Sequence, residues 1–235
     1  MKLVSANLHN EPRAVSWLRR RSHPNHPEHY DVAMVSEAHK RHRALTHLPG
    51  HQYLTGPTRG PSREVGILLS RSLPLLGHGY QFLSPAAPKF ARVGKERWGQ
   101  VALTEYGDTP IAVVALHPVA GPKALHGDDP DHPLVERYAE AMRWLEATIV
   151  SHTDQGHEVI AGGDLQMKER ARPLWSPRHI FANHNMRWLW EGIDVLAWTR
   201  GLELAGPTKT RVIRDFPSDH PALSVQLEPI RRKPR

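Results

Sequence analysis

Short apolar runs bounded by turn residues recur along the chain and predict a domain rich in β-strands. Most runs are dense in valine, isoleucine and leucine, which is typical of strands buried in a sheet. The predicted strands cover residues 3–8, 31–36, 65–70, 100–104, 111–116, 159–162, 193–199 and 222–227.

Helices are predicted where apolar residues recur at intervals of three and four. This spacing predicts an amphipathic helix over about residues 133–152, with a buried face of Leu134, Tyr138, Met142, Leu145 and Ile149. A second helix is expected to begin at Glu11 with Asn10 as its cap, and a shorter one between residues 36 and 48. Because strands and helices do not alternate regularly, the order favours an α/β sandwich with mixed sheets over a doubly wound fold or a barrel.

Length and charge narrow this picture. A chain of 235 residues without a linker of distinct composition suits one domain, which we expect to span residues 1–228 and to be followed by a flexible basic tail at 229–235. Lys and Arg total 31 against 24 Asp and Glu, which gives a formal net charge of +7. A basic surface suits a polyanion, although charge alone leaves an ordinary solvated surface equally open.

Composition also excludes some classes of site. The chain has no cysteine, so disulfides and thiolate zinc sites are excluded. The apolar run at the N-terminus is too short for a signal peptide, and no stretch reaches the length of a transmembrane helix. We therefore expect a cytoplasmic protein with no membrane span, and no obligate protein partner is evident.

Polar residues stand at the ends of several apolar runs and carry the candidate chemistry. Each one alone has an ordinary explanation as a turn residue, a cap or the start of a helix. Asp194 is harder to explain, because it lies between apolar neighbours where a carboxylate needs a partner. The set comprises Asn7, Glu37, His117, Asp164, Asp194 and the segment Ser218-Asp219-His220.

Taken together, these residues indicate chemistry of a hard cation. Mg²⁺ prefers oxygen ligands and is usually held by one or two carboxylates. Such a metal polarises a phosphoryl oxygen and orients the attacking water or the leaving group. A histidine held by a buried carboxylate, such as His220 with Asp194, would complete a base or a charge-stabilising pair. The expected metal ligands are Asn7, Glu37, Asp164 and Asp219.

The same segments, in this order, resemble the endonuclease/exonuclease/phosphatase superfamily, which has the deoxyribonuclease-I-like fold. The similarity extends from about residue 3 to residue 227, and the Ser-Asp-His-Pro motif is its most specific part. The matching segments are Val-Ser-Ala-Asn-Leu at 4–8, Val-Ser-Glu at 35–37, Ala-Leu-His-Pro at 115–118, Gly-Gly-Asp-Leu-Gln at 162–166, Ile-Asp-Val-Leu at 193–196 and Ser-Asp-His-Pro at 218–221.

The resemblance implies a four-layer sandwich of two mixed β-sheets flanked by helices. It also implies a bound Mg²⁺, with Mn²⁺ as an alternative, for which Glu37 is the main ligand with Asn7 and Asp219 beside it. Asp164 would orient or deprotonate the attacking water. His117 and His220, the latter polarised by Asp194, would stabilise the phosphate or assist proton transfer.

Two further residues are expected to contact the substrate phosphate, namely Gln166 and Arg97, although a surface position for Arg97 is equally compatible with the sequence. Gln166 is also a departure, because the superfamily usually has asparagine there, and the extra methylene displaces the amide. A second departure is Ser36, which precedes Glu37 where glutamine is common. The glutamine at 166 leaves the rate of hydrolysis open. All the acidic and histidine residues of the motifs are present, which favours an active enzyme.

The implied activity is metal-assisted attack of water on phosphorus, with DNA or RNA as the expected substrate. Four tryptophans lie among basic residues and could stack on bases, while core packing is the alternative for at least half of them. They are Trp98, Trp175, Trp188 and Trp190. Two other functions stay open: a phosphomonoesterase or phospholipid/inositol-phosphate phosphatase, and a nucleic-acid-binding protein with weakened catalysis.

Overall fold

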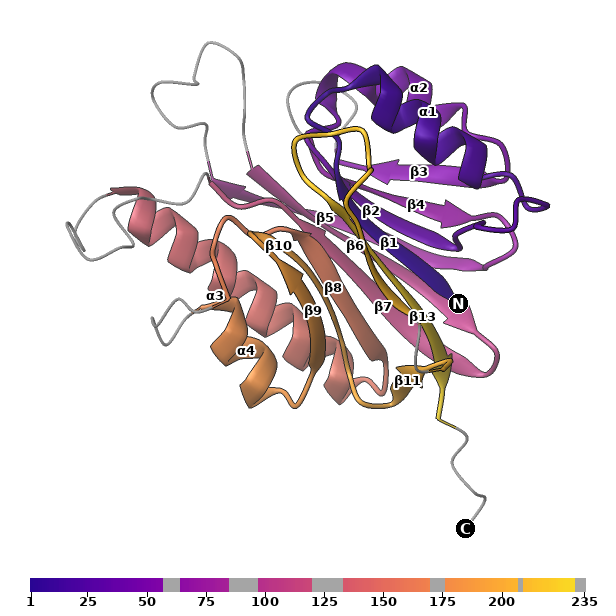
Figure 1. Ribbon diagram of the computed structural model, residues 1–235. Coiled ribbons are helices and arrows are strands. Elements are labelled where there is room, and N and C mark those ends of the chain that lie inside the picture. Colours follow the sequence, from indigo (N-terminus) through magenta and orange to yellow (C-terminus); the bar gives the residue numbers. More distant parts are fainter. Residues whose placement is uncertain (57–63, 85–96, 120–132, 170–175, 207–208, 231–235) are drawn as a thin grey trace.

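Two β-sheets packed face to face form the centre of the molecule (Figure 1). The computed structural model describes residues 1–56, 64–84, 97–119, 133–169, 176–206 and 209–230. The first sheet has the order β11-β13-β1-β2-β4-β3, with β12 paired to β13. Its strands are β1 (Lys2–Asn7), β2 (Val32–Ser36), β3 (His51–Thr55), β4 (Gly66–Ser70), β11 (Leu202–Leu204), β12 (Thr210–Ile213) and β13 (Ala222–Pro229).

The second sheet has the order β5-β6-β7-β8-β10-β9. Both sheets are mixed, since β1 and β2 are parallel in the first and β7 and β8 are parallel in the second, while the other pairs are antiparallel. The strands of the second sheet are β5 (Leu75–Ser84), β6 (Arg97–Tyr106), β7 (Thr109–Leu116), β8 (Glu158–Asp164), β9 (Arg187–Glu191) and β10 (Asp194–Trp198).

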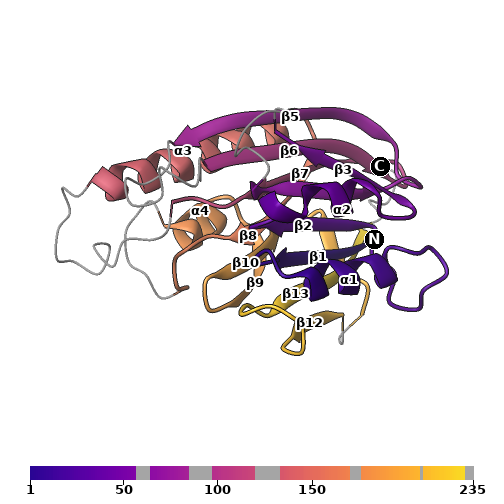
Figure 2. The same cartoon turned by 90° about the horizontal axis from the view of Figure 1, so that it is seen from above.

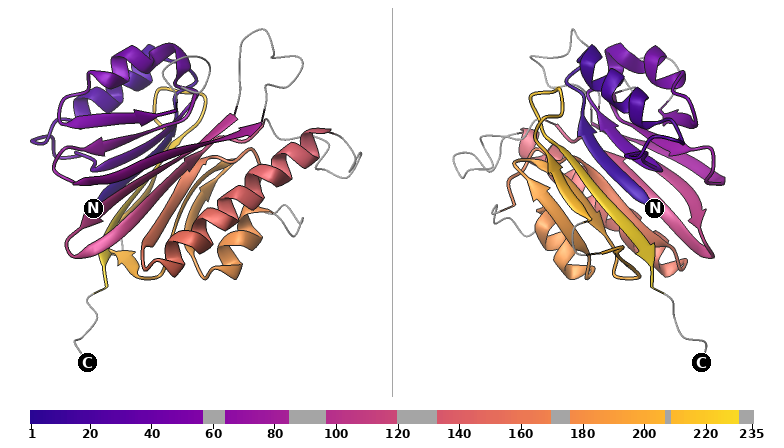
Figure 3. Two further views of the ribbon diagram at one scale, coloured as in Figure 1. Left: turned by 180° about the vertical axis from the view of Figure 1, so that it is seen from behind. Right: turned by 45° about the vertical axis from the view of Figure 1, so that its right-hand side comes forward.

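Helices cover the outer face of each sheet and complete four layers (Figures 2 and 3). On the first sheet lie α1 (Pro12–Arg21), the short 3-10 helix η1 (His39–Arg41) and α2 (His42–Thr46), and on the second lie α3 (Pro133–Asp154) and α4 (Pro177–Asn183). Trp17 and Leu18 of α1 pack on the outward residues of β1 and β2, and Tyr138 and Met142 of α3 pack on those of β7 and β8. The expected four-layer sandwich of two mixed sheets is confirmed.

The space between the sheets is filled by apolar side chains from both. Met34 and Ile67 of the first sheet meet Val113 and Leu196 of the second, and all four are fully buried. The alternate residues of the same strands face the helices, so the central strands are apolar on both faces. This double burial explains why the sequence shows continuous apolar runs there and no alternation.

Every predicted strand is present, whereas two helix predictions were wrong in detail. Asn10 does not cap α1: Glu11 holds the N-cap position without a side-chain bond, and the Asn10 side chain accepts a hydrogen bond from the backbone of Lys40 (3.1 Å). The helix expected over residues 36–48 is divided into η1 and α2. Pro229, which was expected in the tail, still belongs to β13, and residues 231–235 lie outside the described residues.

Five strands escaped prediction: β3, β5, β9, β11 and β12. In β5, the glycines at 77 and 79 and the polar residues between apolar ones weaken the strand signal, yet β6 supplies its hydrogen-bond partners along most of its length. In β9, two tryptophans separated by Leu189 lie between the charged residues Arg187 and Glu191 at an edge of the sheet. Within the described residues, no helix combines the length and the apolar character needed to cross a bilayer.

Candidate active site

Strand ends from both sheets meet at one edge of the sandwich and bring the predicted polar residues together. The parallel strands β1 and β2 end at Asn7 and just before Glu37, and the parallel strands β7 and β8 end just before His117 and at Asp164. Since β10 and β13 run antiparallel to their neighbours β8 and β1, their starting residues lie at this same edge. Asp194 opens β10 and the segment ending in His220 leads into β13.

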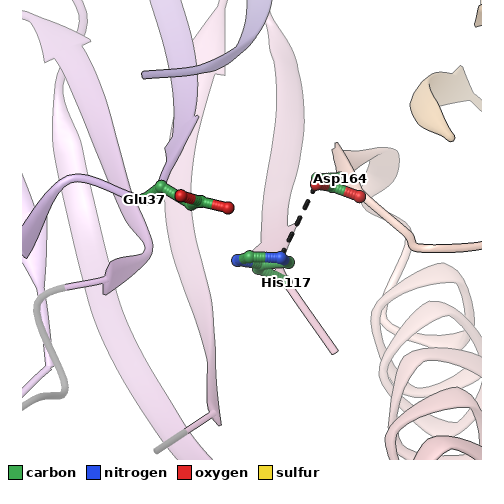
Figure 4. Close-up of side chains that lie close together, drawn as sticks. All are labelled: Glu37, His117 and Asp164. Carbon is green, nitrogen blue, oxygen red and sulfur yellow. Dashed lines mark ion pairs between the residues drawn. The ribbon is translucent and has the colours of Figure 1, made fainter. Parts of the chain in front are cut away.

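Glu37, His117 and Asp164 form the centre of this site (Figure 4). One ligand atom of each lies within 4.8 Å of the other two. The Glu37 carboxylate points toward His117 and Asp164, and Nε2 of His117 lies 3.6 Å from Oδ2 of Asp164. His117 and Asp164 are fully buried and Glu37 is partly buried.

Two amides hold the carboxylates in place. Asn7 donates from Nδ2 to Asp164 (3.0 Å) and more weakly to Glu37 (3.5 Å). Gln166 donates from Nε2 to Asp164 at 2.7 Å and lies 3.1 Å from Nε2 of His117. The longer side chain of Gln166 thus contacts both catalytic candidates, and the effect of its extra methylene on the rate stays a prediction.

Left-handed backbone conformations aim several of these side chains. Glu37, Gln166 and His9 have φ angles of 52°, 56° and 43°. Such values are uncommon for residues other than glycine and cluster where the surrounding structure enforces them, often at functional sites. The turns after β1, β2 and β8 are therefore constrained in the manner expected of a positioned site.

Glu64, which the sequence reasoning missed, lies behind His117. Its carboxylate forms an ion pair with Arg97 and lies 3.4 Å from Nδ1 of His117, and all three side chains are buried. Burial alone would raise the pKa of Glu64, but the hydrogen bond and charge of His117 and of Arg97 lower it to about 2. A carboxylate on Nδ1 orients the ring and leaves Nε2 toward Asp164 and Gln166.

Arg97 is therefore not a surface residue. It is 5% exposed and its guanidinium contacts Glu64 and Nδ1 of His117. Direct binding of phosphate by Arg97 remains a prediction, while its observed role is to compensate a buried carboxylate. The sequence does contain a signal for Glu64, which is a charged residue directly before the apolar run 65–70. Glu37, which was predicted, instead directly follows such a run.

His220 and Asp194 form the second half of the site. Nδ1 of His220 lies 2.8 Å from Oδ2 of Asp194, and the pair is joined by Asp164 into a second group of three possible ligands. The hydrogen bond that Nδ1 of His220 donates to Asp194 raises the pKa of His220 to about 9, against the opposing effect of burial. Burial raises the pKa of Asp194 to about 6, although the bond with His220 opposes this. The hydrogen bond between them therefore favours an imidazolium at His220 that faces a carboxylate at Asp194.

A cavity of about 370 Å³ opens beside this pair. Asp194, His220, Asp219 and Arg214 line it, together with Glu191 and neighbouring backbone. With Nδ1 engaged by Asp194, the Nε2 of His220 is the nitrogen left for a substrate. The volume falls in the usual range of small-molecule pockets.

Asp219 and His9 occupy the outer rim. Nδ1 of His9 lies 3.0 Å from Oδ2 of Asp219 and 3.6 Å from Oε2 of Glu37, so this imidazole stands between two predicted metal ligands. Asp219 is half exposed and belongs to neither of the two ligand groups found in the described part of the chain. His9 was also missed, although it follows the end of a strand as the other candidates do.

The carboxylates suit a divalent cation. In the described part of the chain, neither Glu37 nor Asp164 forms an ion pair with a lysine or an arginine, and the buried Oδ1 of Asp194 has no hydrogen-bond partner. Buried carboxylates are normally compensated by a cation or by complete hydrogen bonding. Oxygen donors of this kind match Mg²⁺ or Mn²⁺ and are unsuited to soft metals.

The tryptophans divide into two kinds. Trp188 and Trp190 on β9 pack against the core under α4, and Nε1 of Trp188 donates to Glu169 (2.9 Å). Trp98 instead lies on β6 beside His117, and Trp175 lies outside the described residues. Core packing is thus the observed role of two of the four.

Comparison with known proteins identifies the architecture. No protein-family model and no curated protein matches the sequence. Among solved structures, an endonuclease/exonuclease/phosphatase from Bacteroides vulgatus has a TM-score of 0.70 at 13% identity, with 97% of this chain and 98% of that chain covered. The fold is that of the endonuclease/exonuclease/phosphatase proteins. At such an identity the likeness establishes the fold and not the activity.

Two other proteins of this fold illustrate its range. A mannosyl-6-phosphatase from Bacteroides thetaiotaomicron has a TM-score of 0.67 at 14% identity, with 97% of this chain and 99% of that chain covered. TDP2 from Caenorhabditis elegans has a TM-score of 0.64 at 16% identity, with 95% and 73% covered. The endonuclease/exonuclease/phosphatase fold expected from the motifs is confirmed across nearly the whole chain.

Proposed function

We propose that this chain is a divalent-metal-dependent phosphodiesterase that hydrolyses nucleic acid. The observation that carries the proposal is the pairing of a buried carboxylate centre with two histidines, each of which has a carboxylate behind it. Glu64 backs His117 and Asp194 backs His220, while Asp164 lies within 4 Å of both rings. Hydrolysis of a phosphate ester needs such a set of groups for water activation and for charge stabilisation.

Glu37 and Asp164 would hold the metal, with Asn7 and Asp219 beside them. When bound, the cation supplies Lewis-acid polarisation of a phosphoryl oxygen. Asn7 already joins the two carboxylates through its amide nitrogen, so it fixes their separation whether or not its oxygen also binds the ion. We propose Mg²⁺ as the ion, with Mn²⁺ as the alternative, because the available ligand atoms are carboxylate and amide oxygens.

The protein groups have distinct tasks in this proposal. Asp164 accepts the proton of the attacking water, and Gln166 keeps its carboxylate oriented by a 2.7 Å bond. As the water oxygen bonds to phosphorus and the bond from phosphorus to the leaving ester oxygen breaks, the imidazolium of His220 passes its Nε2 proton to that leaving oxygen. His117 faces the same centre through Nε2 and adds a second positioned contact. Buried groups of fixed orientation are effective because they need no reorganisation during the reaction.

Nucleic acid is the proposed substrate because the chain carries a formal charge of +7. Phosphate-rich polymers bind basic proteins through many ionic contacts and counterion release. A sugar phosphate is the competing substrate, favoured by the similarity in fold and length to the mannosyl-6-phosphatase. A phosphomonoester ends in a dianion, whereas a nucleic-acid diester continues on both sides of the phosphorus, so the two are separable by experiment.

The test is a substrate panel of single-stranded DNA and RNA, duplex DNA, and sugar and inositol phosphates, assayed with Mg²⁺, Mn²⁺ or EDTA. We expect hydrolysis of a nucleic acid with metal, none in EDTA, and loss of both activity and calorimetric metal binding in Glu37→Gln. Glu203→Gln is the matched control, since Glu203 is an exposed carboxylate on β11 away from the site. Activity on phosphomonoesters alone would refute the substrate, and activity that persists in EDTA would refute the metal.

A further inference from the structure

Aromatic side chains on β5 lie exposed at the same end of the molecule as the candidate active site. Tyr80 and Phe82 are 50% and 42% exposed. They are two residues apart on a strand and therefore point to the same face of the sheet. In the described structure β5 is the edge strand of the second sheet. Two large apolar rings at half exposure are a feature that the hydrolytic site does not explain.

Trp98 joins these rings into one cluster. Its ring lies 5.3 Å from that of Phe82 and 5.8 Å from that of Tyr80, with edge-to-face angles of 74° and 65°. Phe82 is also the direct cross-strand partner of Trp98. The tryptophan supports the two outer rings from one side and leaves them partly exposed, which is a rigid arrangement with little conformational freedom to lose on binding.

Strand register connects the cluster to the catalytic candidates. Gly99 pairs with Leu116 across β6 and β7, so Trp98 and His117 are the next positions on those two strands. Phe82 is one strand further out, which places β5 about 10 Å from β7 at the usual strand spacing. Tyr80 lies about 7 Å further along β5, at roughly 3.4 Å per residue. The rings thus continue outward from the position proposed for the scissile phosphate.

We propose that Tyr80, Phe82 and Trp98 form a stacking surface for the unpaired bases of single-stranded nucleic acid. This inference rests on the proposed function, because it takes the phosphate at His117 as its starting point. Aromatic rings next to a phosphate site bind successive bases by stacking, and the interaction tolerates any base sequence. A duplex keeps its base faces occupied by neighbouring bases, so only a strand with unpaired bases offers them to the protein.

A second copy of the chain is a poorer occupant for this surface. Half-exposed aromatic rings offer about 100 Å² each, whereas a stable dimer buries roughly 800 Å² per partner. The net charge of +7 also opposes association with another copy and favours a polyanion. Dimerisation through β5 would therefore overturn the assignment of these rings as a stacking surface for bases.

Binding is measured by fluorescence anisotropy in EDTA, with a labelled oligothymidylate of about 10 nucleotides, a length within the usual site sizes. An abasic strand of the same length and charge is the second ligand. We expect Tyr80→Ala and Phe82→Ala each to weaken oligothymidylate binding about 5- to 150-fold and to leave abasic binding unchanged. Leu76→Ala is the matched control, since Leu76 is 59% exposed on the same strand but distant from Trp98.

Each outcome decides the assignment. Equal affinity of wild type for the two strands, or equal losses on both in the variants, would overturn it. Sedimentation under the same conditions is run in parallel, and a wild-type dimer that Phe82→Ala converts to monomer would assign the surface to a second copy. Hydrolysis of a nucleic-acid strand without a Phe82 effect refutes the stacking surface and preserves the proposed function. Phe82-dependent binding without hydrolysis preserves the surface and refutes the activity.

Discussion

Replacing Asp194 by asparagine removes the carboxylate that keeps His220 protonated. The asparagine side chain has nearly the same shape, so the 2.8 Å contact with Nδ1 can persist while the charge is lost. In the wild type the pKa of His220 is raised from 6.5 to about 9, chiefly by the hydrogen bond with Asp194. Without that carboxylate, we expect the pKa of His220 to return to near 6.5, because burial opposes the charged form.

The size of the effect follows from these two values. At pH 8 a group with a pKa of about 9 is roughly nine-tenths protonated, whereas one with a pKa near 6.5 is about 3% protonated. The imidazolium is thus depleted about 30-fold at pH 8 but by less than about twofold at pH 6. If His220 acts as a proton donor, hydrolysis should fall by these two different factors.

The primary assay is an NMR titration of the metal-free protein, in which the His220 ring is assigned by its absence in His220→Gln. We expect midpoints near pH 9 in wild type and near 6.5 in Asp194→Asn. Rates measured from pH 6 to 9 then test the catalytic role. A loss of activity that is equal at pH 6 and pH 8 would refute proton donation and leave Asp194 with orientation alone.

Three other substitutions test the geometry. Gln166→Asn shortens a side chain whose Nε2 donates a 2.7 Å hydrogen bond to Asp164. Because this moves the amide by about 1 Å, we expect kcat to fall about 100-fold with little change in KM. Glu64→Gln leaves the Arg97 guanidinium buried without its counter-charge and should lower the free energy of unfolding in urea by about 3 kcal/mol. Gly163→Ala places a methyl group against the Leu116 carbonyl at a φ of 138°, so it should lower the free energy of unfolding by about 3 kcal/mol or more. In the control Gly156→Ala the new methyl group has no neighbour within 4 Å, and the loss should be about 1 kcal/mol. Unchanged kcat in the first variant, or unchanged urea midpoints in the other two, would contradict these assignments.

The site was largely visible in the sequence because its residues obey a local rule. Asn7, Glu37, His117 and Asp164 each follow a continuous apolar run, and such runs are recognisable whenever a strand is buried on both faces. Once the strands are parallel, their carboxyl ends must share an edge. The order of the runs and the polar residues at their ends therefore indicated the pair Asn7 and Glu37 and the pair His117 and Asp164, whereas the packing of the two sheets brings the pairs together.

The remaining features depend on register between distant strands, which no local pattern encodes. Glu64 contacts His117 only because the two sheets are docked face to face, and Phe82 meets Trp98 only through the pairing of β5 with β6. The strand β5 itself was hidden by Gly77 and Gly79, which carry no side chains to form an alternating pattern. The contacts of these residues are thus set by strand pairing and sheet packing, and the local strand propensity of the sequence does not predict them.

The division of the site between the two sheets has a consequence for protein synthesis. Asn7 leaves the ribosome before its partner Asp164, which follows 157 positions later, and His220 lies just before β13. Because β13 lies between β11 and β1 in the first sheet, a nascent chain that stops before His220 lacks both a catalytic candidate and an interior strand. If the protein is the nuclease we propose, this order would keep it inert beside its own messenger RNA until β13 had been synthesised.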